Sequence, residues 1–510
     1  MKSPRFERSF ARVDTGLLKS AFCVVLLTAP ADGQETTRVS VDSWGVEGNK
    51  ESRYSSISAD GQIVAFMSVA SNLVSSDTNG VYDVFVHDRS TGLTERVSVD
   101  SSGAQGNGES KYASISADGR FVAFQSYASN LVAGDRNRSY DIFVHDRSTG
   151  LIERVSMGSS GAEGNNHSRS PAISADGQVV AFYSGASNLV SGDRNKAADV
   201  FIRERLTGIT QRVSVDSSGA EGNRHSYTPS ISADGQIVAF SSDARYLVSG
   251  DTNWTWDVFV HDRSIGLTER VSVHSSGAEG NSMSGWYSSI SADGQIVAFE
   301  SWASNLVFGD TNGTVDVFVH HRSTGVTERV SVDSSGAEGN GWSMDPSISA
   351  DGQIVAFESD SSDLVAGDTN AALDVFVHEP RCKVDASWSN YGAGFPGSSG
   401  VPAFTSRGNP VLGSTLTLDL ANSYGNDTPG LFLVGYQEAV IPTNRGGDLL
   451  LIPAEITLLN VRWLGITIEG DVPDQDELCG IEVFLQVLEI DPGAIRGVSF
   501  TAGLKLVLGD

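Results

Sequence analysis

Short apolar runs alternate with turn-forming residues through residues 37–380, and the same order of runs recurs along this region. In one unit, the run QIVAFM at 62–67 follows an Ala-Asp-Gly turn at 59–61, and the runs DVFVH at 83–87 and ERVSV at 95–99 flank a second turn. Runs this short, rich in β-branched and aromatic residues, predict β-strands rather than helices. With a short strand directly before the Ala-Asp-Gly turn, each unit is expected to contain four strands.

Three strings recur six times each, at a spacing of 58 residues with one extra residue in the fifth unit. Arg-Val-Ser begins at Arg38, Arg96, Arg154, Arg212, Arg270 and Arg329. Ile-Ser-Ala-Asp-Gly begins at Ile57, Ile115, Ile173, Ile231, Ile290 and Ile348. Asp-(Val/Ile)-Phe begins at Asp83, Asp141, Asp199, Asp257, Asp316 and Asp374. A four-stranded sheet that is apolar on both faces needs a neighbour on each side, so six such units predict an all-β, six-bladed β-propeller over residues 37–380.

The two ends of the repeat region are offset by one strand. The region opens with a fourth-strand string at 38–41 and ends with a third-strand string at 374–378, followed by Pro380, which cannot donate a ladder hydrogen bond. We therefore expect the N-terminal strand to complete the last blade and close the ring. An open solenoid is the alternative, and it would leave two unpaired sheet edges.

The string ISADGQIVAF at 57–66 resembles the Ser-Pro-Asp-Gly-Lys-x-Ile-Ala-Phe signature of TolB-type (WD-like) propeller repeats, with Ala59 in place of the proline. The resemblance covers about residues 37–380 and implies the propeller fold. It implies no single activity, because propellers of this kind serve binding, scaffolding and catalysis alike.

The first 31 residues predict a secretory signal peptide. A basic start precedes an apolar run at 21–27, and Ala29-Pro30-Ala31 offers a cleavage site. We therefore expect a secreted, periplasmic or cell-surface protein, monomeric and without a transmembrane span, because no later segment has 18 uninterrupted apolar residues. Loss of residues 1–31, with five basic and two acidic residues, would change the net charge from −28 to −31. Such a charge argues against binding to nucleic acid.

After the repeats, residues 383–510 have a different composition. A stretch rich in Gly, Ser and Pro to residue 406 precedes several short alternating segments, which predict a β-sandwich-like domain. The closing string at 497–509 resembles C-terminal domains of other exported bacterial repeat proteins. Cys382 and Cys479 form an even pair once Cys23 is removed, which suggests one disulfide; two free thiols are the alternative.

Each unit carries Asp-x-Asn-x-x-x-Asp before its third strand. Alternating oxygen ligands suit Ca²⁺, and the string resembles the calcium loops of integrin-type blades without their central Asp. The alternative is that these residues form Asx turns and cap backbone donors. Calcium is thus a candidate stabilising ion and no cofactor is required. The trios are Asp77/Asn79/Asp83, Asp135/Asn137/Asp141, Asp193/Asn195/Asp199, Asp251/Asn253/Asp257, Asp310/Asn312/Asp316 and Asp368/Asn370/Asp374.

The long loops of a propeller, between second and third strands and between blades, open on one face, here called the long-loop face. The residues just before each first strand are the most diverse in the repeat, and we expect them to ring the mouth of the central channel there. Aromatic rings among hydrogen-bonding neighbours suit a sugar or peptide ligand; ordinary rim packing is the alternative. The candidate ligand-binding residues are Arg53, Tyr54, Lys111, Tyr112, Arg169, Tyr227, Trp286, Tyr287 and Trp342.

No catalytic Ser-His-Asp or Cys-His arrangement can be assigned from the sequence. We therefore expect an exported binding or interaction module for a glycan, peptide or protein ligand rather than an enzyme. The alternative is an extracellular propeller hydrolase or lactonase acting on glycans or esters, with Glu300 and Asp345 at the mouth. An enzyme should show one non-repeated cluster of polar residues with shifted pKa values, whereas a binder should show an aromatic rim.

Overall fold

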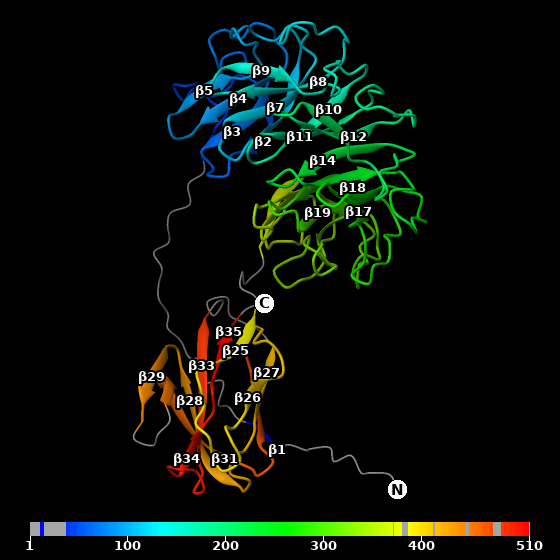
Figure 1. Ribbon diagram of the computed structural model, residues 1–510. Helices are drawn as coiled ribbons and strands as arrows, with labels where there is room; N and C mark the ends of the chain where they lie inside the picture. Colours follow the sequence, from blue (N-terminus) through cyan, green and yellow to red (C-terminus); the bar gives the residue numbers. More distant parts are fainter. Residues whose placement is uncertain are drawn as a thin grey trace. The chain divides into compact units, whose positions relative to one another are not determined.

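The computed structural model describes residues 11–14, 37–370, 372–379, 386–411, 414–443, 448–472 and 481–508. They belong to two compact units, a blade unit (Gln34–Glu379) and a C-terminal unit that joins Met1–Gly33 to Pro380–Asp510 (Figure 1). The described residues form strands and turns without a helix, which confirms the all-β class, and none of these segments is a helix that could cross a membrane.

The blade unit contains five antiparallel four-stranded sheets and one three-stranded sheet. The first blade has strands β2 (Ser52–Ile57), β3 (Ile63–Ser68), β4 (Asp83–Asp88) and β5 (Leu93–Arg96). The second and third blades have strands β6 (Ser110–Ile115), β7 (Phe121–Ser126), β8 (Asp141–Asp146), β9 (Leu151–Arg154), β10 (Ser168–Ile173), β11 (Val179–Ser184), β12 (Asp199–Glu204) and β13 (Ile209–Arg212). The last three have strands β14 (Ser226–Ile231), β15 (Ile237–Ser242), β16 (Asp257–Asp262), β17 (Leu267–Arg270), β18 (Ser284–Ile290), β19 (Ile296–Ser301), β20 (Asp316–His321), β21 (Val326–Arg329), β22 (Ser343–Ile348), β23 (Val355–Ser359) and β24 (Asp374–His378).

Neighbouring blades share their apolar faces. Strand β3 packs on β6, β7 on β10, β11 on β14, β15 on β18 and β19 on β22, so the blades follow one another around a curved array (Figure 1). The Ser-Ala-Asp-Gly turn reinforces each junction. Ser58 Oγ donates to Asp60 Oδ1 at 2.6 Å, and Ala59 N–H donates to the carbonyl of Ala117 in the next blade at 2.9 Å. Each following blade repeats this bond to the next one: the N–H groups of Ala117, Ala175, Ala233 and Ala292 donate, in this order, to the carbonyls of Ala175, Ala233, Ala292 and Ala350.

The expected closure of the ring by the N-terminal strand is not confirmed. The sixth sheet has three strands, and Val375 and Val377 on β24 are 72% and 59% exposed, whereas Val84 and Val86 on β4 are fully buried. At the other end of the array, Ile57 is 58% exposed. Among the described backbone groups, no sixth bond joins the Ala350 amide to the first blade. The array therefore has two uncovered ends.

The C-terminal unit consists of two sheets and a hairpin. One sheet is β1 (Ala11–Asp14), β32 (Ile466–Asp471), β27 (Thr415–Leu420) and β26 (Phe404–Ser406). The other is β25 (Ser387–Tyr391), β35 (Gly503–Val507), β33 (Glu482–Ile490), β28 (Thr428–Gly435) and β31 (Glu455–Val461), with β34 (Val498–Phe500) on β33; β29 (Glu438–Pro442) pairs with β30 (Asp448–Leu451). Alternate residues of β27 and β33, such as Leu418 and Leu485, belong to one buried core.

Two predictions for this unit concern residues outside the described part of the chain. Cys382 and Cys479 both lie there, so their disulfide stays a prediction. Of the predicted signal peptide over 1–31, the structure describes only the four residues of β1, which pair parallel with β32. The signal peptide also stays a prediction.

Candidate functional site

The first strand of every blade contains a β-bulge at the positions that the sequence singled out. The register of β2 on β3 shifts between Arg53 and Ser56, four other blades show the same shift, and in the fifth blade the shift extends from Ser284 to Ser288. Left-handed φ angles between 46° and 53° occur at Tyr54, Tyr112, Ser170, Thr228 and Asp345. Residues other than glycine are disfavoured there, and strained positions of this kind cluster at ligand sites.

The bulges also explain an error in the predicted strand boundaries. The sequence pattern places Arg53 and Tyr54 before the first strand, whereas β2 begins at Ser52 and includes both. In the fifth blade, Gly285 adopts the left-handed conformation with φ 74°, and β18 is one residue longer than the other first strands. The extra residue of the fifth unit thus lies at the bulge, beside Trp286 and Tyr287.

Side chains from four blades converge at these bulges. The rings of Tyr54 and Tyr112 lie with their centroids 4.7 Å apart. Burial raises the pKa of Tyr287 to about 12, and the nearby charge of Asp345 and the phenols of Tyr54 and Tyr112 contribute to the rise. Burial and the neighbouring Glu358 also raise the pKa of Asp345. We call Tyr54, Tyr112, Tyr287, Glu300 and Asp345 the central cluster.

Glu300 is the most buried acid of the central cluster, and its carboxylate has a structural partner. The side chain extends from β19, and burial raises its pKa to about 7. Its Oε2 accepts a hydrogen bond from the backbone N–H of Asp345 at 3.0 Å. Gln125 holds the equivalent place in the second blade, where its Oε1 accepts from the N–H of Ser170 at 3.0 Å. Glu300 therefore holds a bulge, as an uncharged glutamine does elsewhere.

A second group of rings crosses from the fourth blade to the fifth. His225 and Tyr227 lie 5.5 Å apart at 11°, Tyr227 and Trp256 5.5 Å apart at 18°, and Trp256 and Trp286 5.9 Å apart at 20°. These four residues are the aromatic stack. Thr228 Oγ1 donates to the carbonyl of Trp286 at 2.8 Å and so joins the two blades beside it. Trp286 is 56% exposed, so the stack ends at solvent.

The remaining predicted residues lie in smaller groups. Trp342 meets Trp302 edge-on at 5.8 Å. Arg53 pairs with Glu51 and Lys111 with Glu109, both at 2.7 Å. Arg169 lies 4.9 Å from the ring of Tyr140. The three cations thus have local partners and do not form one binding site.

The sequence analysis missed three contributors, Gln125, His225 and Tyr183, whose ring lies 4.9 Å from that of Tyr227. A signal existed for two of them. The position after Val-Ala-Phe holds a different residue in almost every unit, namely Met67, Gln125, Tyr183, Ser241, Glu300 and Glu358. Variation at one position of a nearly constant repeat marks the side chains that lie beside the bulges.

The aspartates of the trios contact an arginine in five blades. In the third blade, Arg212 Nη1 lies 2.7 Å from Glu221 Oε2, 3.2 Å from Asp199 Oδ2 and 3.7 Å from Asp193 Oδ1. We call this set a cage: the trio of a blade, the arginine of its fourth strand and the acid of the following linker. The same contacts surround Arg154, Arg270 and Arg329, while in the first blade Arg96 has Gln105 in place of the acid. The first aspartates of the other four trios, 3.5 to 3.9 Å from their arginines, are Asp77, Asp135, Asp251 and Asp310.

The asparagines of the trios act as hydrogen-bond donors to protein groups, which disagrees with their predicted role as calcium ligands. In the second blade, Asn137 Nδ2 donates to Asp141 Oδ2 at 2.8 Å and to the carbonyl of Gly164 at 2.9 Å, while its Oδ1 accepts from the N–H of Ser139 at 2.8 Å. The last contact is that of an Asx turn. The same three contacts are made by Asn79, Asn195, Asn253 and Asn312.

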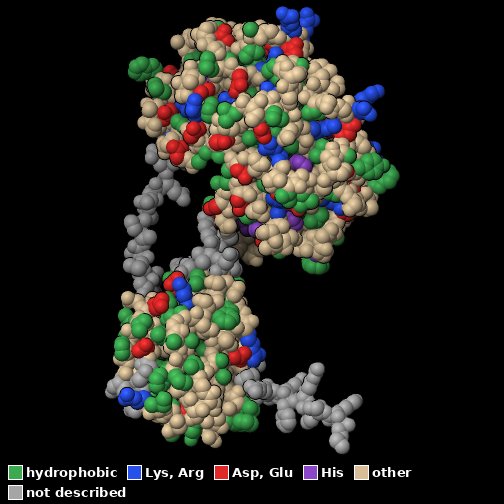
Figure 2. Space-filling model, viewed as in Figure 1, with side chains coloured by type: hydrophobic (Ala, Val, Ile, Leu, Met, Phe, Trp, Pro, Cys, Tyr) green, Lys and Arg blue, Asp and Glu red, His purple; other side chains and the backbone are tan. Residues whose placement is uncertain are grey.

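The cages account for the recurring Arg-Val-Ser string. In the third blade its arginine enters the cage, Val213 joins the core, and Ser214 Oγ donates to Asp199 Oδ1 at 2.7 Å. Burial raises the pKa of Asp257 to about 6 in spite of the neighbouring Arg270. Elsewhere the basic and acidic side chains are intermixed over the surface seen in Figure 2.

The residues present do not fit a calcium ion while the arginine is in the cage. The carboxylate oxygens of Asp193, Asp199 and Glu221 lie within 4.8 Å of one another, close enough for a metal, but the Arg212 guanidinium already supplies the positive charge there. The amide of Asn195 turns a hydrogen, not an oxygen, toward Asp199. These contacts favour the alternative of turns and caps, and calcium stays a prediction.

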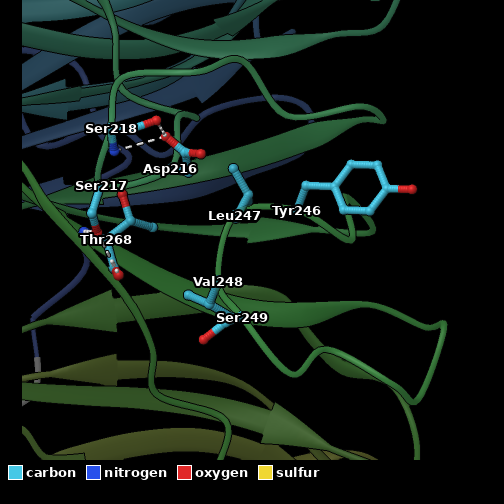
Figure 3. A pocket seen from close by; sticks show the side chains of 8 residues that line it. All are labelled: Asp216, Ser217, Ser218, Tyr246, Leu247, Val248, Ser249 and Thr268. Carbon is cyan, nitrogen blue, oxygen red and sulfur yellow. Dashed lines mark hydrogen bonds between the residues drawn. The ribbon is translucent and has the colours of Figure 1, made fainter.

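A hollow of about 530 Å³ lies on the fourth blade, between the linker residues Asp216–Ser218 and the loop before β16 (Figure 3). Tyr246 stands where four other blades have an asparagine that holds the linker, as Asn188 does through the carbonyl of Glu163 at 2.9 Å. Its side chain points away from Ser217 and Thr268 (Figure 3). Ser218 is bonded to Asp216, and Thr268 to the carbonyl of Val215, so the hollow is a weaker candidate than the mouth.

Comparison with protein-family models and with curated proteins found no match. Among solved structures, the chain is similar to a protein assigned as a TolB of Agrobacterium tumefaciens, with 14% identity over 55% of this chain and 80% of that one, at a TM-score of 0.33. It is also similar to the extracellular domain of a hybrid two-component system of B. thetaiotaomicron, with 10% identity and a TM-score of 0.32. That alignment covers 88% of this chain and 45% of the other.

A third similar structure is assigned as an exo-β-1,3-galactanase of Bifidobacterium bifidum, with 11% identity over 58% of this chain and 96% of that one, at a TM-score of 0.27. All three structures match with TM-scores below 0.5. Likenesses of this size bring neither a substrate nor an activity to this chain.

Proposed function

We propose that the blade unit is a non-catalytic binding module that captures a glycan at the aromatic stack on its long-loop face. The carrying observation is the near-parallel set of Tyr227, Trp256 and Trp286, which ends at a half-exposed indole. Sugar rings present flat C–H faces that bury area against such rings at little cost in conformational entropy. The hydroxyl and carboxylate groups of the central cluster supply polar partners for sugar hydroxyls.

The backbone strain supports a binding role for the mouth. Thr228 and Asp345 hold left-handed angles that a glycine, such as Gly285 in the fifth blade, adopts with less strain, and each such position costs roughly 1–3 kcal/mol. A structural role alone would favour glycine in every blade. Side chains retained at that cost support a ligand-binding role for these positions.

The experiment is a glycan-array screen with the full chain, followed by calorimetric titration of the best glycan against variants. Trp286→Ala should weaken binding by about tenfold, the size of one lost ring contact, with an unchanged unfolding midpoint. Trp44→Ala is the matched control, because Trp44 is also exposed on the blade unit but lies outside the stack. Peptide capture in place of glycan capture, or equal binding by Trp286→Ala, would contradict the proposal.

A second function, hydrolysis of a glycan or ester, is favoured by one observation. The central cluster is non-repeated, and it places Glu300, with its pKa of about 7, beside Asp345. We prefer the binding module, because the Glu300 carboxylate already accepts a backbone hydrogen bond that Gln125 accepts in the second blade. Turnover of array-positive glycans or of esters by the wild type, lost in Glu300→Gln, would favour the hydrolase.

The proposed setting is an exported, monomeric protein whose six blades form a closed ring. Support for export comes from the sequence of residues 1–31, and support for a ring from the mouth itself. The pKa of Tyr54 in the first blade is raised by Tyr112, by burial and by the charge of Asp345 in the sixth blade. This electrostatic influence of the sixth blade on the first supports a ring.

A further inference from the structure

The sixth cage is divided between the two ends of the repeat region. Five cages take their arginine from the fourth strand of the blade and their acid or glutamine from the linker that follows it. The sixth trio, Asp368, Asn370 and Asp374, lies in the last blade, which has three strands. Counting by the repeat, its arginine is Arg38 and its acid is Glu47, both in the N-terminal segment before the first blade.

Each half already has the geometry of a complete cage. Asn370 Nδ2 donates to Asp374 Oδ2 at 2.7 Å, and its Oδ1 accepts from the N–H of Ala372 at 2.8 Å. The corresponding distances at Asn195 are 2.9 and 2.8 Å. In the other half, Arg38 Nη1 pairs with Glu47 Oε2, as Arg212 pairs with Glu221.

The N-terminal segment also has the position of a linker. Thr94 Oγ1 on β5 donates to the carbonyl of Val41 at 2.5 Å, and Thr94 N–H donates to Ser43 Oγ at 3.0 Å. The linker between the second and third blades contacts Thr210 in the same way, at 2.5 and 2.9 Å. One side of the segment is therefore docked on the first blade, as that linker is docked on the third.

The other side of the segment and the edge of β24 each lack the neighbouring strand that buries the equivalent residues in the first blade. Val97 is fully buried, and its N–H donates to the carbonyl of Val84 on β4 at 2.9 Å. Val39, its equivalent, is only partly buried, and Val375, the equivalent of Val84, is mostly exposed. The two surfaces are complementary in charge as well, because one carries the arginine of a cage and the other carries two carboxylates.

We propose that the edge of β24, with Asp368, Asn370 and Asp374, is a docking site for residues 37–47 of the same chain, and that Arg38 is the cation that completes it. Closure then depends on this one side chain, because a caged carboxylate pair without its arginine would be buried uncompensated. The same chain is the favoured occupant. Its segment is held on the first blade by Thr94 and is joined to the sixth blade through one chain, so the effective concentration is high.

The experiment is hydrogen–deuterium exchange on the full chain, following peptides that cover 37–43 and 374–378. In the wild type both should be protected to the level of the equivalent peptides of the first blade. Arg38→Met should release both together, with exchange faster by about tenfold or more, while the peptides of the second to fifth blades stay protected. Arg38→Lys keeps the charge and should retain most of the protection.

Arg53→Met is the matched control, because Arg53 lies in the first blade and pairs with Glu51 outside any cage. Free exchange of 374–378 in the wild type, or protection unaffected by Arg38→Met, would overturn the proposal. Sedimentation of the same samples separates the occupants. A monomer with a protected edge supports docking within one chain, whereas a protected edge found only in oligomers would assign it to a second copy.

Discussion

The cages and the mouth are formed by the same repeat, but the cages have constant side chains, whereas the side chains at the mouth differ from blade to blade. The cages keep their arginine and their two aspartates in five blades, with Arg212 and its counterparts almost fully buried. The mouth keeps its backbone, a bulge with a left-handed residue, and changes the side chain from Tyr54 to Thr228 to Asp345. Constant side chains thus mark what every blade needs in order to fold, and constant backbone with changing side chains marks what a ligand would read.

The largest change in stability is expected when the arginine of a cage is removed. Arg212→Met leaves Asp199, Asp193 and Glu221 without their cation, and removing one partner of a buried ion network costs about 3–5 kcal/mol. Urea unfolding followed by intrinsic fluorescence would measure it. Arg224→Met is the control, because Arg224 pairs with Asp243 at 3.2 Å on the surface and should cost no more than about 1 kcal/mol. Equal losses of unfolding free energy in the two variants would show that the cages do not stabilise the fold more than a surface ion pair does.

A smaller effect is expected from Glu300→Gln, which gives the fifth blade the residue of the second. The folded pKa of Glu300 is about 7 against an ordinary value of 4.5, so the folded protein binds the proton more tightly than the unfolded one. The stability that comes with this tighter proton binding at Glu300 is fully present below about pH 4.5 and is lost as the pH rises to about 7. The variant should therefore match the wild type at pH 4 and exceed it at pH 8 by up to about 3 kcal/mol.

The reciprocal change, Gln125→Glu, sharpens the same prediction. It should introduce into the second blade the loss of stability between pH 4.5 and 7 that Glu300→Gln removes from the fifth. Denaturant unfolding at several pH values measures both variants. A Glu300→Gln protein that keeps the wild-type pH dependence would show that the carboxylate titrates without a cost from burial.

The smallest expected change in stability is at Trp254, which holds φ 62° where Gly80 and Gly313 stand in the first and fifth blades. Trp254→Gly should leave the free energy of unfolding within about 1 kcal/mol, because relief of the left-handed strain offsets the lost contact with Arg245 at 3.7 Å. Thermal unfolding measures this change. A loss of stability well above 1 kcal/mol would show that the contact between Trp254 and Arg245 outweighs the backbone strain.

Several features could be predicted because they depend on neighbouring residues. The apolar run at 62–67 became β3 and the run at 83–87 became β4, shifted by no more than one residue. The start of β2 could not be predicted, because its bulge places Tyr54 in a conformation that sequence propensity assigns to glycine. The apolar pattern of residues 462–468 suggests one strand, but a turn closed by Gly465 N–H on the carbonyl of Arg462 separates β31 from β32.

Some features of the candidate site could likewise be predicted from the sequence, and others could not. The sequence alone determined six units, their strands, the Asp-Asn-Asp trios and the variable positions of the mouth, because a repeat displays its constant and changing residues directly. Only the tertiary structure decided that the cation beside five of the six trios is an arginine, since pairing of the third strand with the fourth brings Arg212 to Asp199 across 13 residues of chain. It also decided that Tyr227, Trp256 and Trp286 form one stack, because their contacts cross a boundary between blades that no local pattern describes.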